Sequence, residues 1–467
     1  MKHIQTDVAI IGGGTAGMSA FRAARSHTDR VLLIEDHHFG TTCARVGCMP
    51  SKLLISAANA RYNAQHTDLF GINVQGKVTT DGKAVMQRVK AERDRFVSFV
   101  LSDVNDFPDE CKLLGRATFQ DEHTLIVNTD EGKVSVQFER AVIATGSRPA
   151  MINDWLKLGD KLIVNDDVFN WDTLPESVAV FGTGVIGLEL GQALHRLGVK
   201  VYLFGQFGFI GSLTDPVVLQ KAQNIFHNEL EIYFDTQNTI SLNSQGKVQI
   251  EFEHNGEQHK IETDYLLAAI GRTPNTDNIG LENLNIERNP RGVPVADPLT
   301  MQTSLPHIFI AGDSSAQIPL LHEAADQGKI AGSNAGTYPI INKGLRRSGV
   351  NVIFSEPQIM SAGDRWINLK DRQDEIAIGE VSFDNQGRSR VMGVNHGHMR
   401  LYADRNTGRF LGAEMVGPAA EHIAHLLAWA HQAQMTISQM LDMPFYHPVI
   451  EEGVRTALRD VMSKLQK

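Results

Sequence analysis

The chain has 467 residues, of which 42% are hydrophobic, and its formal net charge at pH 7 is −10. This length exceeds one hydrophobic core and predicts roughly three or four units. No apolar run approaches the about 18 residues of a membrane-spanning helix, and no basic-then-apolar leader opens the chain, so we expect a cytoplasmic protein without membrane contact. The negative charge is spread along the chain, which argues against nucleic acid and favours small molecules or proteins as partners.

The first predicted elements, in residues 7–36, are a strand, a glycine turn, a helix and a second strand. The turn has Gly12, Gly14 and Gly17 in the G-x-G-x-x-G spacing that places a dinucleotide diphosphate at a helix N-terminus. Gly12 would permit the tight turn, Gly14 would let the backbone approach the diphosphate, and Gly17 would let the helix pack closely. Glu35 ends the second strand, where a carboxylate accepts a hydrogen bond from a ribose hydroxyl.

Two cysteines, Cys43 and Cys48, follow in the segment TTCARVGCMPSK. On an ideal helix their α-carbons would lie about 8 to 9 Å apart, beyond the about 7 Å limit for a disulfide, so a bridge requires a distorted backbone between them. Metal binding is an alternative, but no further ligands stand at a recognisable spacing, and a structural disulfide is disfavoured in a reducing compartment. A redox-active pair beside a nucleotide fold fits best. The third cysteine, Cys111, is expected to be structural.

Residues 177–205 repeat the strand, glycine turn, helix and strand, with Gly182, Gly184 and Gly187 in the same spacing. One glycine triplet is weak support for a nucleotide site, but the repeat indicates two independent dinucleotide sites. Two apolar segments that end in glycine, arginine and proline, at 140–149 and 264–275, are predicted to close the two units.

The second site differs from the first at the end of its second strand. Gly205 occupies the position equivalent to Glu35, and neither an acidic ribose partner nor an arginine for a 2′-phosphate stands there. The usual test between NAD and NADP therefore favours neither nucleotide. One interpretation is that backbone groups or water bind the ribose. The more specific hypothesis is that the choice between the two nucleotides is weakened or relaxed.

With these residues in place, the chain resembles the FAD-dependent pyridine nucleotide–disulfide oxidoreductases over essentially its whole length, and most of all those that oxidise dihydrolipoyl groups. The family cysteine motif is close to G-G-T-C-x-N-x-G-C-x-P-S-K, from which this sequence departs at Thr41 and Arg45. The resemblance implies an α/β fold with two Rossmann-like dinucleotide-binding domains and an α+β C-terminal dimerisation domain. The implied domains are FAD-binding (1–149 and 276–346), NAD(P)-binding (150–275) and dimerisation (347–467).

The resemblance also implies roles for single residues. Cys48 would be the charge-transfer thiolate nearer the flavin, and Cys43 would be the interchange thiol that exchanges with the substrate. Lys52 would lie near flavin N5, with the Glu189 carboxylate keeping it charged. Asp313 would hydrogen-bond the FAD ribityl chain. The residues expected to bind the two nucleotides are the two glycine triplets, Glu35, Lys52, Thr145, Gly146, Gly271, Arg272 and Asp313.

A histidine base is implied near the C-terminus. His447-Pro448 followed by Glu452 matches the family's H-P-x-x-x-E arrangement, in which the glutamate orients the imidazole. Disulfide exchange needs such a group to move a proton. A second histidine, usual in the family two positions earlier, is Phe445 here. In the family this histidine reaches the cysteines of the other subunit, so the resemblance implies a homodimer with shared active sites.

The implied activity is two-electron transfer between a nicotinamide nucleotide and a dithiol or disulfide through FAD and a Cys43–Cys48 disulfide. NAD is expected with NADP as the alternative, no metal is expected, and the expected substrate is a dihydrolipoyl group or a lipoyl domain. Alternatives are another small disulfide of glutathione type, a quinone acceptor, or a redox sensor or scaffold without turnover. The paired thiols argue against a transhydrogenase, and the lack of a C-terminal vicinal cysteine pair argues against a mercuric reductase.

Overall fold

The computed structural model describes residues 1–465. The chain forms two compact units, each assembled from three stretches of sequence. Unit 1 comprises Met1–Pro50, Lys90–Ala150 and Arg272–Arg346, and unit 2 comprises Ser51–Val89, Met151–Gly271 and Arg347–Lys467.

Unit 1 is built on a seven-stranded sheet. Its strands are β1 (Lys2–Ile11), β2 (Val31–Glu35), β3 (Lys112–Leu114), β4 (Arg116–Asp121), β5 (Thr124–Thr129), β6 (Gly132–Ile143) and β17 (Ile308–Ile310). The order is β3-β2-β1-β6-β5-β4, with β17 paired to β6. The strands β1, β2, β3, β6 and β17 pair in parallel, and residues Val8 to Ile11 of β1 are buried, as expected for a sheet covered on both faces.

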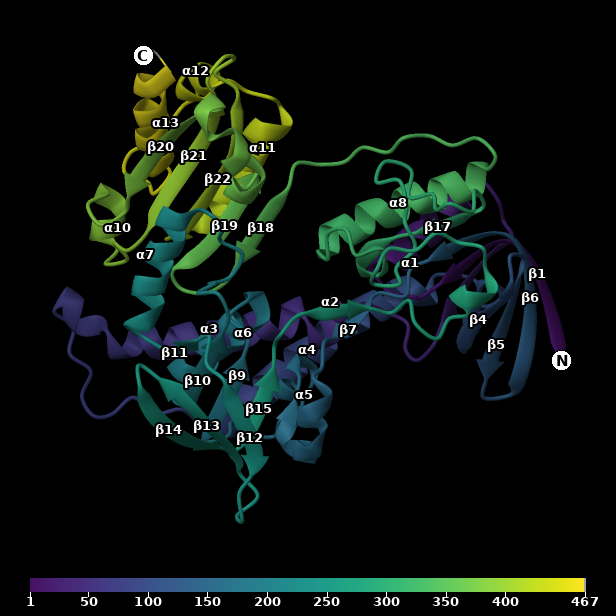
Figure 1. Ribbon diagram of the computed structural model, residues 1–467, viewed down its shortest axis with the longest axis horizontal. Coiled ribbons are helices and arrows are strands. Elements are labelled where there is room, and N and C mark those ends of the chain that lie inside the picture. The colour runs from purple at the N-terminus through teal and green to yellow at the C-terminus, as the bar shows by residue number, and fades with distance from the viewer. Residues whose placement is uncertain (466–467) are drawn as a thin grey trace. The chain divides into compact units, whose positions relative to one another are not determined.

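Two helices, α1 (Thr15–Arg25) and α8 (Leu321–Thr337), lie side by side in unit 1 (Figure 1). Their backbones approach so closely that a Cβ added at Gly328 or Gly332 would lie 2.2 Å from the carbonyl oxygen of Ala16 or Ala20. Glycine at these two positions of α8 therefore sets the distance between the helices, and with it the position of α1 behind the first glycine turn.

The part of unit 2 that contains the second glycine turn has a parallel sheet in the order β11-β10-β9-β15-β8. These strands are β8 (Leu162–Ile163), β9 (Ser177–Phe181), β10 (Lys200–Gly205), β11 (Glu231–Phe234) and β15 (Tyr265–Ala268). An antiparallel sheet of β12 (Asn238–Leu242), β13 (Val248–His254) and β14 (Glu257–Thr263) precedes β15. Helix α6 (Val185–Arg196) follows the glycine turn between β9 and β10, and α7 (Pro216–His227) connects β10 to β11.

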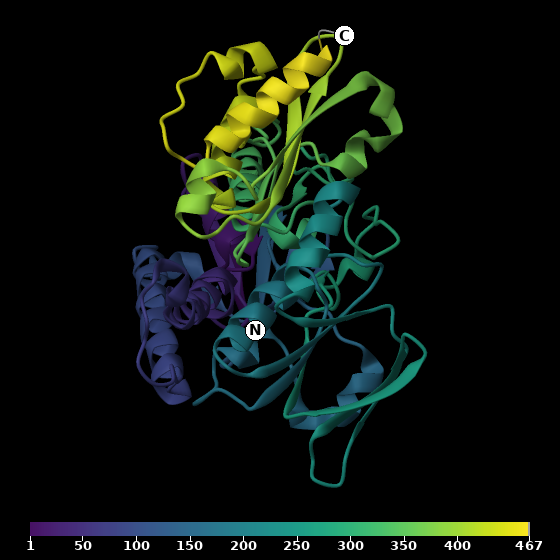
Figure 2. The ribbon, with the colours of Figure 1, turned by 90° about the vertical axis from the view of Figure 1, so that its left-hand side faces the viewer.

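The C-terminal part of unit 2 has an antiparallel sheet in the order β18-β19-β22-β21-β20. Its elements are β18 (Val350–Ile353), β19 (Gln358–Gly363), β20 (Ile376–Ser382), β21 (His398–Asp404), β22 (Phe410–Gly417), α11 (Ala420–Gln432) and α13 (Glu452–Leu465). Alternate residues of β21, among them Met399 and Leu401, pack under α11 and α13, whereas Tyr402 belongs to a separate cluster. Figure 2 shows α13, in yellow, lying along these strands.

The remaining elements connect these sheets. The helices are α2 (Thr42–Val46), α3 (Cys48–Gln65), α4 (Gly82–Asn105), α5 (Asn165–Val168), α9 (Trp366–Leu369), α10 (Gly387–Val391) and α12 (Ile437–Leu441). Two short strands are β7 (Ser147–Pro149) and β16 (Arg272–Pro274), and the 3-10 helices are η1 (Thr67–Phe70), η2 (Asp109–Cys111), η3 (Asn153–Lys161), η4 (Leu281–Asn283), η5 (Gly312–Ser315) and η6 (Lys370–Glu375).

The predicted fold class is confirmed. Each glycine turn joins a buried parallel strand to a helix, and the C-terminal part pairs an antiparallel sheet with helices. Within residues 1–465, no helix has the length and apolar character needed to cross a membrane.

Candidate functional site

The first glycine turn has the geometry of a diphosphate-binding loop. Gly12 has φ +111°, and an added Cβ there would lie 2.2 Å from the carbonyl oxygen of Ala144, so the turn requires glycine. At Gly17 an added Cβ would lie 1.8 Å from the carbonyl oxygen of Gly12. At Gly14, by contrast, no described atom comes within 4 Å of the added Cβ. The turn is thus packed against the sheet on one side and open beside Gly14.

Glu35 ends β2, as the sequence predicted, and its carboxylate lies against this turn. Its Oε2 atom accepts a hydrogen bond from the backbone N–H of Gly13 at 2.6 Å, and Oε1 accepts one from that of His37 at 3.1 Å. Each carboxylate oxygen has a further lone pair. The carboxylate is therefore held in place by the backbone and keeps acceptor capacity for a ribose hydroxyl.

The two duplicated segments meet in unit 1, where β7 pairs antiparallel with β16. Ser147 Oγ donates to Asp313 Oδ2 at 2.6 Å and accepts from Arg272 Nε at 2.8 Å. Thr145 Oγ1 donates to the carbonyl oxygen of Asn275 at 2.6 Å. The sequence indicated the two segments but not their pairing, and Ser147, which links Arg272 to Asp313, was missed because a single serine carries no spacing signal.

Unit 1 also has buried polar atoms that have no hydrogen-bond partner within the described residues. Among residues 1–465, the buried Nε2 atoms of His322 and Gln327, both on α8, have no hydrogen-bond partner. Gln327 is held through its Oε1 atom, which accepts from the backbone N–H of Gly312 at 2.8 Å. Open space also adjoins Gly146, whose φ is +69°. Buried nitrogens without a hydrogen-bond partner, together with the open space beside Gly146, fit a bound dinucleotide in unit 1.

The segment with the two cysteines has the predicted break. Helix α2 ends at Val46, Gly47 has the non-helical angles φ −127° and ψ −118°, and α3 begins at Cys48. An added Cβ at Gly47 would lie 3.0 Å from the α-carbon of Cys43. Glycine therefore lets the chain fold back on Cys43 between the two cysteines. Cys43 is half-buried and Cys48 is exposed, whereas Cys111 is buried in the core of unit 1, where burial raises the pKa of its thiol.

Both departures from the family motif have local structural roles. Thr41 is the N-cap of α2, because its Oγ1 atom accepts from the backbone N–H of Ala44 at 3.2 Å. Arg45 donates through Nη2 to the carbonyl oxygen of Phe39 at 3.1 Å. The two residues hold the turn before Cys43 and the helix that contains it.

In unit 2, Lys52 and Glu189 form the predicted ion pair. Lys52 Nζ lies 2.8 Å from Oε2 and 3.0 Å from Oε1 of Glu189, which is 4% exposed. Phe354, which sequence reasoning did not identify, contacts both members of this pair. Its backbone N–H donates to Glu189 Oε1 at 2.9 Å, and its ring centroid lies 4.6 Å from Lys52 Nζ. The carboxylate thus accepts from both the ammonium and the backbone.

His447 and Glu452 are also in contact, as predicted. His447 Nδ1 lies 2.9 Å from Glu452 Oε2, and the imidazole is 80% exposed. Glu452 begins α13, where the helix dipole stabilises an anion, and its Oε1 atom accepts from Arg455 Nη2 at 2.6 Å. Burial alone would raise the pKa of Glu452, but the bonds from His447 and the Val449 N–H, together with Arg455, lower it.

Phe445, which replaces the second histidine of the family, supports the same group. Its ring lies 5.7 Å from the guanidinium carbon of Arg455, the residue that pairs with Glu452. The substitution therefore supplies an aromatic contact for the arginine that orients the carboxylate.

The second glycine turn repeats the geometry of the first. Gly182 has φ +115°, and an added Cβ there would lie 2.2 Å from the carbonyl oxygen of Ala269. An added Cβ at Gly187 would lie 1.8 Å from the carbonyl oxygen of Gly182, and the space beside Gly184 is open for 4 Å among described atoms. Gly271, with φ +119°, also faces open space. Like the first turn, this turn is packed against the sheet on one side and open beside its middle glycine.

The structure explains why Gly205 is not acidic. An added Cβ would lie 2.7 Å from both the Phe234 ring and Thr183 Oγ1, so a side chain does not fit. The carboxylate next to this position comes instead from the neighbouring strand. Asp235 follows β11, its backbone N–H donates to the Gly205 carbonyl oxygen at 3.0 Å, and its Oδ1 atom accepts from the Phe207 N–H at 2.6 Å. Asp235 was missed because the motif places the acid on β10.

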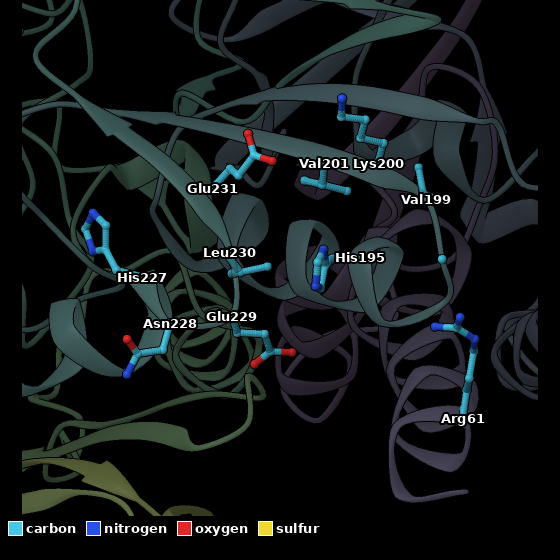
Figure 3. A pocket seen from close by; sticks show the side chains of 11 residues that line it. Arg61, His195, Val199, Lys200, Val201, His227, Asn228, Glu229, Leu230 and Glu231 are labelled. Carbon is cyan, nitrogen blue, oxygen red and sulfur yellow. The ribbon is translucent and has the colours of Figure 1, made fainter. Parts of the chain in front are cut away.

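A cavity of about 550 Å³ lies at the opposite edge of this parallel sheet (Figure 3). It is lined by the ends of α6 and α7, the strands that follow them, and Arg61 of α3. Arg61 donates through Nη1 to the carbonyl oxygen of Arg196, and burial lowers the pKa of His195. Because the cavity lies at helix C-termini and away from the second glycine turn, it is separate from the predicted nucleotide site.

A second cavity, of about 580 Å³, lies in the C-terminal part beside the segment that contains His447. Its lining is mainly apolar, and Trp429 and Tyr446 on its rim are highly exposed. Exposed aromatic groups around a cavity are typical of a surface that is covered in an assembly.

Comparison with known families gives two matches. Residues 6–328 match the family described as pyridine nucleotide-disulphide oxidoreductase. Residues 350–458 match the dimerisation domain of the same family.

Individual proteins agree with this assignment. The chain is 28% identical to a dihydrolipoyl dehydrogenase from Geobacillus stearothermophilus, over 96% of this chain and 94% of that one. It is 29% identical to a mercuric reductase from Shigella flexneri, over 96% of this chain and 80% of that one. The crystal structure of LpdA from Mycobacterium tuberculosis superposes with a TM-score of 0.83, at 22% identity and over 97% of this chain and 99% of that one, which shows a shared fold.

Proposed function

We propose a dihydrolipoyl dehydrogenase reaction for this chain, which belongs to the pyridine nucleotide-disulphide oxidoreductase family. The chain is an FAD-dependent disulfide oxidoreductase similar to dihydrolipoyl dehydrogenases, and enzymes of this class use FAD and NAD(P)H. The observation that carries the proposal is the His447–Glu452 contact, because a sensor or scaffold has no need for an oriented base.

The proposed reaction begins with proton removal. His447 takes the proton of the first substrate thiol, and the resulting thiolate attacks Sγ of Cys43 in the Cys43–Cys48 disulfide. A mixed disulfide forms, the Cys43–Cys48 bond breaks, and Cys48 leaves as a thiolate. The second substrate thiol loses its proton to solvent and attacks the substrate sulfur of the mixed disulfide. The substrate is then an oxidised disulfide, and Cys43 leaves and takes the proton that His447 holds.

Glu452 keeps the imidazole ready for both proton transfers. It accepts from Nδ1, which leaves Nε2 directed away from the carboxylate and available to the substrate. An adjacent anion also stabilises the protonated imidazole that forms in the first step.

When bound, FAD would supply the two-electron redox chemistry that links the reduced cysteines to NAD(P)⁺. We assign its diphosphate to the turn with Gly12, Gly14 and Gly17, and its adenosine ribose to Glu35. Asp313 would hold the ribityl chain, close to Thr145 and Gly146. Lys52, held by Glu189, would place a positive charge beside the flavin.

The second glycine turn is proposed to bind the nicotinamide nucleotide. Its diphosphate would bind at the turn with Gly182, Gly184 and Gly187. The open space beside Gly184 and the close backbone packing at the other two glycines support this assignment. Gly271 and Arg272, where the chain passes between the units, are proposed to bind nucleotide as well. The proposed domain boundaries are FAD-binding at 1–149 and 276–346, NAD(P)-binding at 150–275, and dimerisation at 347–467.

The match to the dimerisation domain supports a homodimer. We propose further that each active site is shared, with the cysteines of one subunit served by His447 of the partner subunit. The high exposure of this imidazole supports the proposal, because 80% of the side chain remains open to a second subunit while Nδ1 is bound to Glu452. A cytoplasmic location and a lipoyl-domain substrate complete the proposal.

Substrate assays on the FAD-loaded dimer test this function. We expect NADH-dependent turnover with lipoamide to exceed turnover with oxidised glutathione or a quinone by at least about tenfold in kcat/KM. Cys43→Ser should abolish lipoamide turnover, and Cys111→Ala is the matched control that should retain it. Equal activity of Cys43→Ser would contradict the proposal. Faster reduction of glutathione or quinone would identify one of the alternative acceptors, and no flavin reduction by either nucleotide would indicate a sensor or scaffold.

A further inference from the structure

The loop that follows β10, residues 206–211, presents two aromatic side chains to solvent. Phe207 is 74% exposed and Phe209 is 50% exposed. Their ring centroids lie 6.0 Å apart with an interplanar angle of 63°, so the rings meet edge to face. Two neighbouring phenylalanines that both remain exposed lose the stabilisation that burial of their rings would provide.

Four hydrogen bonds hold this loop in place. Phe207 N–H donates to Asp235 Oδ1 at 2.6 Å, and the carbonyl oxygen of Gly208 accepts from Gln223 Nε2 at 2.6 Å. The carbonyl oxygen of Phe209 accepts from Thr183 Oγ1 at 2.5 Å, and Gly211 N–H donates to the Thr183 carbonyl oxygen at 2.8 Å. The two rings are therefore presented on a braced loop.

The backbone of Phe207 is strained. Its φ is +56°, in the left-handed region that bulky side chains rarely adopt, and the following Gly208 has φ +63°. Glycine or asparagine would adopt this conformation at lower cost, so the aromatic side chain is not explained by the turn itself. Strain of this kind is concentrated at ligand-binding positions.

The place of the loop indicates the ligand. Thr183, which binds the loop twice, belongs to the second glycine turn between Gly182 and Gly184. In a nucleotide-binding sheet the adenosine lies just beyond the second strand, which here is β10 with the loop attached to its end. A carboxylate at Gly205 itself is sterically excluded, so the usual ribose contact from the end of β10 is missing, and the nearby carboxylate of Asp235 already accepts the Phe207 N–H.

We propose that Phe207 and Phe209 form a stacking platform for the adenine ring of the nicotinamide nucleotide. The platform contributes affinity that the family ordinarily obtains from the ribose carboxylate. A purine face stacks on an aromatic ring regardless of a 2′-phosphate, so the platform serves NAD and NADP alike. The inference rests on the proposed assignment of this turn to the nicotinamide nucleotide.

Titration calorimetry on the FAD-loaded dimer tests the platform with ligands that cannot reduce flavin. ADP-ribose and its 2′-phosphate carry the adenine, whereas nicotinamide mononucleotide lacks it. Phe207→Gly removes the ring and relieves the positive φ, so the variant should melt no lower than the parent protein. We expect the Kd of ADP-ribose and of its 2′-phosphate to rise about tenfold each, and that of the mononucleotide to stay unchanged.

Further variants separate stacking from a structural effect. Phe207→Tyr should retain adenine binding, and Phe209→Leu should weaken it in the same direction as Phe207→Gly. Phe99→Leu, at a phenylalanine of α4 that is 56% exposed, is the control and should leave adenine binding unchanged. A Kd for ADP-ribose within twofold of the parent value in both Phe207→Gly and Phe209→Leu would overturn the platform. Absence of lipoamide turnover in the parent protein, together with weakened ADP-ribose binding in both variants, would instead count against the proposed reaction and leave the platform standing.

Discussion

Lys52 Nζ lies 2.8 Å from Oε2 of Glu189, a carboxylate that is almost fully buried and also accepts the backbone N–H of Phe354. An ammonium and a carboxylate that share a buried site are strongly coupled, because removing one leaves the other without compensation. The pair joins α3, which begins at Cys48, to α6 behind the second glycine turn.

Glu189→Gln should therefore impair both stability and electron transfer. Lys52 keeps 31% of its side chain exposed, so we expect a loss of about 2 kcal/mol, below the usual cost of breaking a fully buried pair. Stopped-flow reduction of the flavin by NADH should slow by about tenfold, because Lys52 would no longer be held at the position that we propose for it beside the flavin. Asp109→Asn, which alters an ion pair between Lys112 and a fully exposed carboxylate, is the control and should change neither quantity.

His447→Asn should separate the two half-reactions. Loss of the base should lower dihydrolipoamide oxidation by about 10² to 10⁴-fold, as for other removed proton-transfer groups. Reduction of the bound flavin by NADH needs no proton transfer at this position and should proceed at the rate of the parent protein. If both half-reactions slowed together, His447 would have a structural role instead. Glu452→Gln should lower dithiol oxidation less, because the base itself remains.

The Glu452 contacts should make stability depend on pH in acid. The pKa of Glu452 is lowered in the folded chain, so its carboxylate contributes stability that is present above the unfolded glutamate pKa of about 4.3. That contribution is lost as pH falls through the lower folded-state pKa. Thermal melting of the parent protein and Glu452→Gln should differ at pH 6, and the difference should shrink between about pH 4 and pH 3. A difference that is constant over this range would refute the assignment.

Gly205→Glu should fail to create an NAD-specific site. The Phe234 ring and Thr183 Oγ1 occupy the space that the new side chain needs, and Thr183 also holds the Phe207–Phe209 loop. We expect a loss of about 1–3 kcal/mol from overpacking and weaker binding of both nucleotides. Gly387→Ala, at an exposed position where an added Cβ meets no described atom within 4 Å, is the control and should melt like the parent protein.

Asp235→Asn should shift the choice between the two nucleotides. The amide oxygen retains the bond to the Phe207 N–H, but the negative charge beside the proposed ribose position disappears. The kcat/KM for NADPH should rise relative to that for NADH by about threefold to tenfold, with a larger effect at low ionic strength. For the parent protein we expect a preference below about a thousandfold. A stronger preference for either nucleotide would rule out relaxed choice.

The sequence by itself determined the elements whose signals are local. Both glycine turns and the break between Cys43 and Cys48 follow from spacings of a few residues, where backbone sterics decide the geometry. The contact of His447 with Glu452 was predicted through the arrangement that the family shares. The Lys52–Glu189 pair is far apart in sequence and was predicted only through the family resemblance.

Other relationships depend on which strands become neighbours, so only the tertiary structure decided them. The pairing of β7 with β16 brings Ser147 between Arg272 and Asp313, and the adjacency of β10 and β11 places Asp235 beside Gly205. Likewise, Phe354 reaches the Lys52–Glu189 pair from a segment with no motif of its own. Such contacts arise from the packing of distant segments, where no residue spacing exists for a sequence pattern to record.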